Sequence, residues 1–115
     1  MTFDDVRKIA LAWPEVENST SYGTPSLKVR NKMLVRLKED GDSLVMPSVP
    51  RDERELLVAR APKVFYFTDH YRDYPMMLIR LSNTRREIIE PFLRRCWREL
   101  VSKAAVKEFD RARES

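Results

Sequence analysis

The sequence has few of the residues that build metal centres, disulfide frameworks and phosphate-binding loops. Its 115 residues include one cysteine, one histidine and two glycines. The single cysteine, Cys96, excludes an internal disulfide and a cysteine-pair zinc site. Gly23 and Gly41 lie too far apart to form a glycine-rich loop that cradles phosphate. These shortages argue against a disulfide scaffold, a zinc module and the usual nucleotide-binding folds.

Long apolar runs are also missing. None approaches the ~20 residues that a membrane helix needs. The first residues, MTFDDVRKIALAWP, begin with acids rather than bases, so we expect no signal peptide. The composition, 43% hydrophobic and 35% charged, is typical of a globular protein. We therefore expect a single domain over residues 1–115, cytoplasmic, monomeric or weakly dimeric, with no membrane partner.

Acids are absent from one segment, although the net charge of the chain is only +4. Residues 26–38, SLKVRNKMLVRLK, contain five bases and no acid. A local patch of one sign attracts a polyanion more effectively than total charge does. On charge alone, two interpretations stay open: a nucleic-acid or anion-binding surface, and a solvated sheet face whose lysines discourage aggregation.

The apolar spacing changes along the chain in a way that predicts an α+β fold. Thr2, followed by Asp5, is typical of a capped helix start, and Pro14 ends that helix. Apolar residues then alternate from 15 to 47, which predicts a three-stranded meander preceded by a strand around 17–22. Further on we expect a helix at 51–61, strands at 64–67 and 76–81, and a last helix with a capping box at 84–87. From about residue 105 the chain is charged, and we expect its end to fray.

The first predicted hairpin determines which face carries the charge. A three-residue turn, Arg30-Asn31-Lys32, pairs Val29 with Met33 and Leu27 with Val35, and places both pairs on one apolar face. A two-residue turn at Asp40-Gly41 then pairs Leu37 with Leu44. In this register Leu34 and Val45 point outward. So do three basic side chains: Lys28, Arg36 and Lys38.

The segment TDHYRDYP, residues 68–75, joins two predicted strands and has several interpretations. Metal binding would use Asp69, His70 and Asp73, without a second histidine. A hydrolytic triad is geometrically poor, because adjacent Asp69 and His70 point to opposite sides of an extended chain. A structural turn and a nucleic-acid contact remain. We therefore expect no enzyme activity, no metal and no cofactor. Cys96 lies on the apolar stripe of the last helix and is expected to be a buried thiol.

Three segments resemble the MmcQ/YjbR family: SYGTPSLKVRNKMLVRL, DHYRDYPMMLIRL and RRCWREL. The resemblance spans nearly the whole chain. It implies an α+β domain of the CyaY-like fold, with an antiparallel sheet packed on one face by N-terminal and C-terminal helices. It also implies DNA binding through two wings, here the hairpin at Arg30-Asn31-Lys32 and the loop Thr68–Pro75. Asn31 stands where the family more often has glycine, and asparagine tolerates the same backbone geometry.

Our hypothesis is a protein that contacts duplex DNA through phosphates, with weak sequence preference. The rival hypothesis is a non-enzymatic protein-interaction or small-ligand module that uses a groove between Tyr22, His70 and Tyr74. The predicted DNA contacts are Lys28, Arg30, Lys32, Arg36, Lys38, His70, Tyr71 and Arg72.

Overall fold

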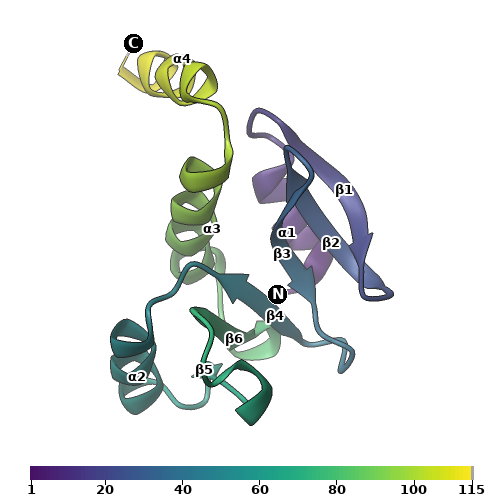
Figure 1. The fold of residues 1–115 in the computed structure, drawn as a ribbon, viewed down its shortest axis with the longest axis vertical. Coiled ribbons are helices and arrows are strands. Elements are labelled where there is room, and N and C mark those ends of the chain that lie inside the picture. Colours follow the sequence, from purple (N-terminus) through teal and green to yellow (C-terminus); the bar gives the residue numbers. More distant parts are fainter. Residues whose placement is uncertain (115) are drawn as a thin grey trace.

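The computed structural model describes residues 1–114 and has the predicted α+β architecture (Figure 1). A six-stranded antiparallel sheet has the order β1-β2-β3-β4-β6-β5. Its strands are β1 (Val16–Ser21), β2 (Thr24–Val29), β3 (Lys32–Leu37), β4 (Ser43–Pro47), β5 (Phe65–Tyr66) and β6 (Met76–Arg80). The helices are α1 (Phe3–Ala10), α2 (Arg51–Arg60), α3 (Arg86–Leu100) and α4 (Lys103–Glu114), with short 3-10 turns η1 (Asp69–Tyr71) and η2 (Leu81–Asn83).

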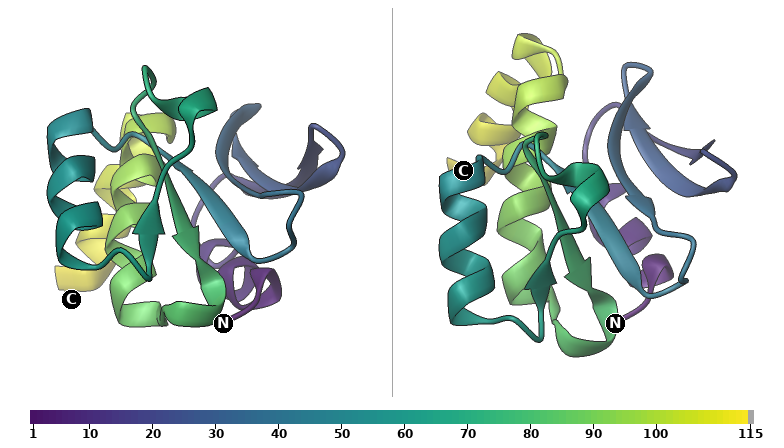
Figure 2. Two further views of the ribbon diagram at one scale, coloured as in Figure 1. Left: turned by 90° about the horizontal axis from the view of Figure 1, so that it is seen from below. Right: turned by 60° about the horizontal axis from the view of Figure 1, so that its bottom comes forward.

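The helices gather on one side of the sheet, as the two views in Figure 2 show. The main core lies between them and the sheet, and it includes Val6, Leu27, Val35, Met46, Ile79, Leu93 and Trp97. The opposite face has a smaller cluster of Val45, Tyr71 and Leu78, to which no α-helix within residues 1–114 contributes. The predicted packing of helices on one face is therefore confirmed, and the other face is left open.

The helix ends follow the sequence in one case and not in another. Thr2 and Asp5 form the predicted capping box at the start of α1. The capping box predicted at residues 84–87 is absent. Helix α3 begins at Arg86, and its N-cap residue Arg85 makes no side-chain cap bond. Residues from about 105, expected to fray, belong to α4. Phe109 of α4 packs edge-on against Trp97 with ring centroids 4.9 Å apart, which anchors this amphipathic helix to the core.

The register predicted for the first hairpin is wrong. The turn contains two residues, Arg30 and Asn31, both with positive φ, so Val29 pairs with Lys32. A β-bulge then restores the expected pairing of Leu27 with Val35. As a result Met33 lies on the open face and Leu34 is buried in the main core, the reverse of the prediction. The bulge lets one strand bury consecutive side chains, which strict alternation does not anticipate.

The flanking turns set the shape of the open face. Leu37 pairs with Leu44 as predicted, but the Lys38 N–H bonds to the Ser43 carbonyl, so residues 39–42 form the loop. The β1–β2 turn consists of Tyr22 and Gly23, with φ of 53° and 78°. A tyrosine in the left-handed region is strained, because its Cβ crowds the backbone there. Within residues 1–114 no helix is long and apolar enough to cross a membrane.

Candidate binding site

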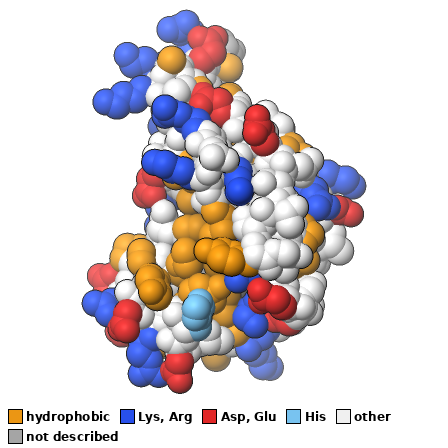
Figure 3. Space-filling model, turned by 45° about the vertical axis from the view of Figure 1, so that its right-hand side comes forward, with side chains coloured by type: hydrophobic (Ala, Val, Ile, Leu, Met, Phe, Trp, Pro, Cys, Tyr) orange, Lys and Arg blue, Asp and Glu red, His pale blue; other side chains and the backbone are white. Residues whose placement is uncertain are grey.

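The open face of the sheet contains a hollow of about 1010 Å³, bordered by β1, β2, β3, β4 and the 68–75 loop. We call it the sheet hollow. Its floor is largely apolar, formed by Met33, Val45 and Met76. Figure 3 shows hydrophobic side chains gathered on this side of the molecule, with the histidine at their edge. Tyr22, His70 and Tyr74, which the sequence grouped as a possible groove, all border this one hollow.

Arg36 lies at the base of the sheet hollow and is only 6% exposed. Its guanidinium donates to the Tyr71 hydroxyl over 2.9 Å. It also donates to the Glu39 carboxylate over 3.1 Å and, more weakly, to Thr24 and the Leu37 carbonyl. The prediction that Arg36 projects into water is therefore wrong. Its charge has a carboxylate partner, and its donors organise the protein.

The pair formed by Arg36 and Glu39 is buried at one end only. Glu39 lies in the β3–β4 loop with its side chain 60% exposed. A hydrogen bond from its own backbone N–H and the neighbouring Arg36 guanidinium hold the pKa of Glu39 below its ordinary value. The carboxylate is thus ionised at neutral pH and contributes negative charge to the wall of the hollow. Tyr22 closes the same corner, with its ring 5.2 Å from the Arg36 guanidinium.

The 68–75 loop supplies the opposite wall. Its first part is the 3-10 turn η1, in which Tyr71 is buried and His70 is exposed. The two rings meet edge-on at 4.7 Å. Arg72 is exposed but ion-paired with Asp69. Of the three residues predicted to contact DNA from this loop, Tyr71 is turned inward, while His70 and Arg72 stay accessible.

A buried arginine from α2 holds this loop in place. Arg54 is 2% exposed and donates to four backbone carbonyls, those of Tyr71, Arg72, Tyr74 and Met76, at 2.8–3.0 Å. The Phe67 ring lies 3.9 Å from its guanidinium. Burial, followed by the nearby charge of Arg51, lowers the pKa of Arg54. The sequence carried no signal for this role, because Arg54 stands among other charges on a short, weakly amphipathic helix.

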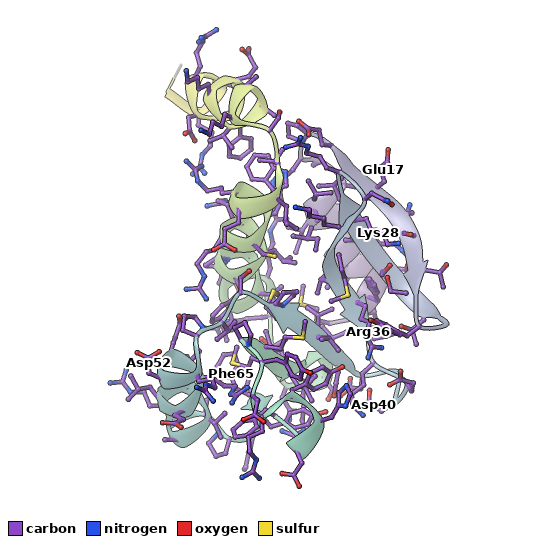
Figure 4. The ribbon with its side chains drawn as sticks, viewed as in Figure 1. Glu17, Lys28, Arg36, Asp40, Asp52 and Phe65 are labelled. Carbon is purple, nitrogen blue, oxygen red and sulfur yellow. The ribbon has the colours of Figure 1, made fainter. Side chains whose placement is uncertain are left out.

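Four of the predicted cations remain free. Arg30 and Lys32 are exposed at the β2–β3 turn, while Lys28 and Lys38 are half-buried. None of the four forms an ion pair with a carboxylate in the part of the chain that the structure describes. Figure 4 shows Lys28 and Arg36 on the neighbouring strands β2 and β3. Glu17 of β1 lies opposite Lys28 in the register, and Glu39 and Asp40 follow Lys38 in the β3–β4 loop, so acids lie beside two of these cations.

The structure also places the residues considered for metal or thiol chemistry. Among residues 1–114 no group of three or more histidine, cysteine, aspartate or glutamate side chains is arranged to hold a metal ion. Cys96 is 1% exposed and lies on the core side of the sheet, with its thiol directed at the Leu34 carbonyl. Burial raises the pKa of Cys96 to about 11, so its reactive thiolate form is suppressed at neutral pH.

Comparisons with known proteins support the fold. The family model described as YjbR matches residues 11–101. The crystal structure of Deinococcus radiodurans protein DR2400, with its family-model domain DUF419, aligns with a TM-score of 0.67 at 20% sequence identity. The alignment covers 93% of this chain and 86% of that chain. At this identity the likeness establishes a shared fold and nothing more. The comparison with curated proteins gives no match.

Proposed function

This chain belongs to the YjbR family, and from that premise we propose that it binds DNA through phosphate contacts made by the β2–β3 hairpin and its neighbours. The assignment confirms the resemblance seen in the sequence. Binding to DNA is the function that this resemblance implied. We expect the protein to act in the cytoplasm, with weak preference for any base sequence.

The observation that supports the proposal is that four cations form no ion pair in the described part of the chain. Lys28, Arg30, Lys32 and Lys38 come from one basic segment, and none is neutralised by an ion pair within residues 1–114. By contrast, Arg36 in the same segment has both a carboxylate partner and a buried position. A cation without an ion-pair partner, on a surface with many ion pairs, is available to a phosphate.

The contact set therefore differs from the one expected from sequence. Lys28, Arg30, Lys32 and Lys38 remain as phosphate contacts, and Arg72 joins them if it exchanges Asp69 for a phosphate. Arg36 and Tyr71 hold the surface in shape instead. With about four phosphates neutralised, the slope of log affinity against log salt should be about −3 to −4.

The test is a titration of a labelled DNA duplex with the protein at two salt concentrations between about 50 and 200 mM. The variant Arg30→Glu/Lys32→Glu should weaken binding strongly and flatten the salt slope by about 2. Lys8→Glu/Arg60→Glu is the matched control, because it changes the charge equally at exposed positions on α1 and α2. The proposal is wrong if the duplex does not bind at low salt, or if both double variants behave alike.

A second candidate function is a small-ligand or peptide site in the sheet hollow. Its volume of about 1010 Å³ reaches the upper end of the ~300–1,000 Å³ that ligand pockets occupy. The apolar floor of Met33, Val45 and Met76 favours this reading. If this protein shows no affinity for DNA and a neutral ligand raises its melting temperature, the second candidate is favoured over the first.

A further inference from the structure

We propose that the sheet hollow receives unpaired bases, so that the protein prefers single-stranded DNA to duplex. This inference depends on the proposed DNA binding and names the form of DNA that the site accepts. The supporting observation is the uneven distribution of exposed apolar side chains. Large apolar side chains are exposed at only a few described positions, and two of them, Tyr22 and Tyr74, stand on opposite sides of the hollow.

Both tyrosine rings are held out of the core by the fold. Tyr22 is 84% exposed and occupies a turn position with φ of 53°, a strained geometry for a large side chain. Tyr74 is 56% exposed, and Arg54 fixes its backbone through a 3.0 Å bond to its carbonyl. The Tyr22 ring contacts the Arg36 guanidinium at 5.2 Å, but both rings are largely open to water, and exposed aromatic rings are suited to stacking on bases.

The sheet hollow also offers surfaces that complement the two parts of a single strand, its bases and its phosphates. Its floor is apolar, and Lys28 and Asn31 border it with hydrogen-bond donors. The free cations Arg30 and Lys32 lie at the same turn as Asn31. An occupant that combines planar apolar rings with a repeating negative charge matches this arrangement. An unpaired DNA strand has both, with its rings accessible.

A duplex cannot use the hollow in this way. Its bases are stacked inside the helix, and its outer surface presents phosphates to the protein. A duplex would therefore contact the free cations and leave the apolar floor and the rings of Tyr22 and Tyr74 exposed. The single strand should therefore have additional affinity that depends on the two tyrosines and on the bases, and the duplex should not.

The test compares three labelled probes at low salt by fluorescence anisotropy. They are an oligothymidylate of about 12 nucleotides, within the ~4–16 typical of single-strand sites, a duplex of the same length, and an abasic strand with the same phosphates. We expect the oligothymidylate to bind roughly tenfold or more tightly than the other two. Tyr22→Ala/Tyr74→Ala should remove that advantage and leave duplex binding unchanged, whereas Tyr22→Phe/Tyr74→Phe should retain it.

The outcomes separate this inference from the proposed function. Equal affinity for all three probes, or an oligothymidylate affinity that the alanine variant leaves unchanged, overturns the preference for unpaired bases while DNA binding stands. If none of the probes binds, both proposals fail. Thermal melting of the alanine variant checks that it is folded, and the phenylalanine variant supplies the same test with the rings in place.

Discussion

The guanidinium of Arg36 donates to the hydroxyl oxygen of Tyr71 over 2.9 Å and so joins β3 to the 68–75 loop. The two residues are 35 positions apart in the sequence, and both are buried. This bond connects the two walls of the sheet hollow. It also means that the Arg36 guanidinium and the Tyr71 hydroxyl are engaged within the protein, although both residues were predicted to contact DNA.

Tyr71→Phe is expected to lower the free energy of unfolding by about 1–3 kcal/mol, because it leaves a buried charged donor without its partner. Urea denaturation measures the change. Tyr74→Phe is the matched control. Its hydroxyl bonds to no described residue, so the variant should stay within about 0.5 kcal/mol of wild type. Equal effects of the two variants would contradict the role assigned to the bond.

Arg54→Lys is expected to loosen the 68–75 loop. A lysine ammonium has three donors on one atom, and it cannot reproduce the planar contacts of a guanidinium with four carbonyls. The loss should be about 2–3 kcal/mol, with faster amide exchange at residues 71–76. Arg51→Lys, at an exposed ion pair of 3.7 Å, should change neither quantity appreciably. Unchanged exchange in the Arg54 variant would show that the loop does not depend on these bonds.

Tyr22→Asn is expected to stabilise the protein while weakening its binding to single strands. Asparagine followed by glycine suits a hairpin turn with two positive φ values, so the variant should relieve about 1 kcal/mol of the strain at Tyr22. Thermal melting and anisotropy titration measure the two effects. A variant that is less stable would contradict the strain assigned to Tyr22, and a variant that binds single strands as tightly as wild type would contradict the role of its ring.

The thiol of Cys96 is expected to resist modification in the folded protein. With its pKa raised to about 11 by burial, it should react with an aromatic disulfide reagent roughly 100-fold or more slowly than an unfolded thiol at about pH 8. The denatured protein provides the reference rate. Fast labelling of the native state would show that the contact between α3 and the sheet opens readily.

Asp40 is expected to make stability depend on acid pH. Burial opposes its ionisation, but bonds from the Asp42 and Ser43 N–H groups and the Ser43 hydroxyl outweigh that effect and lower the pKa of Asp40. A carboxylate with a lowered pKa stabilises the fold above its unfolded pKa, and that contribution disappears as pH falls through the folded value.

Asp40→Asn should therefore cost about 1 kcal/mol at neutral pH, and the gap to wild type should narrow below about pH 4. Denaturation at the two pH values measures this. The matched control is Glu55→Gln, an exposed position on α2. A gap that is the same at both pH values would mean that the charge of Asp40 is not what stabilises the loop.

Much of the architecture follows from local patterns. The periodicity predicted β1 through β4, the flanking prolines Pro50 and Pro62 predicted the position of α2, and the Thr2–Asp5 capping box is present as expected. The family resemblance predicted the sheet with helices on one face. The candidate site was predicted in part, since Tyr22, His70 and Tyr74 do border one hollow. Patterns of this kind are readable because backbone geometry and turn chemistry act over a few residues.

The exposure of each cation, by contrast, could not be predicted from alternation along the strands. Alternation treated Lys28 and Arg36 as equivalent outward-facing residues, yet one borders the hollow as a free charge and the other is buried beneath it. What separates them is distant in sequence: the Tyr71 hydroxyl and the shape of a loop that Arg54 holds from α2. Local order of polar and apolar residues thus specified the strands, but not the β-bulge that reversed the faces of Met33 and Leu34. Only the packing of remote segments decided which charges water can reach, because burial depends on what the rest of the chain lays over a side chain.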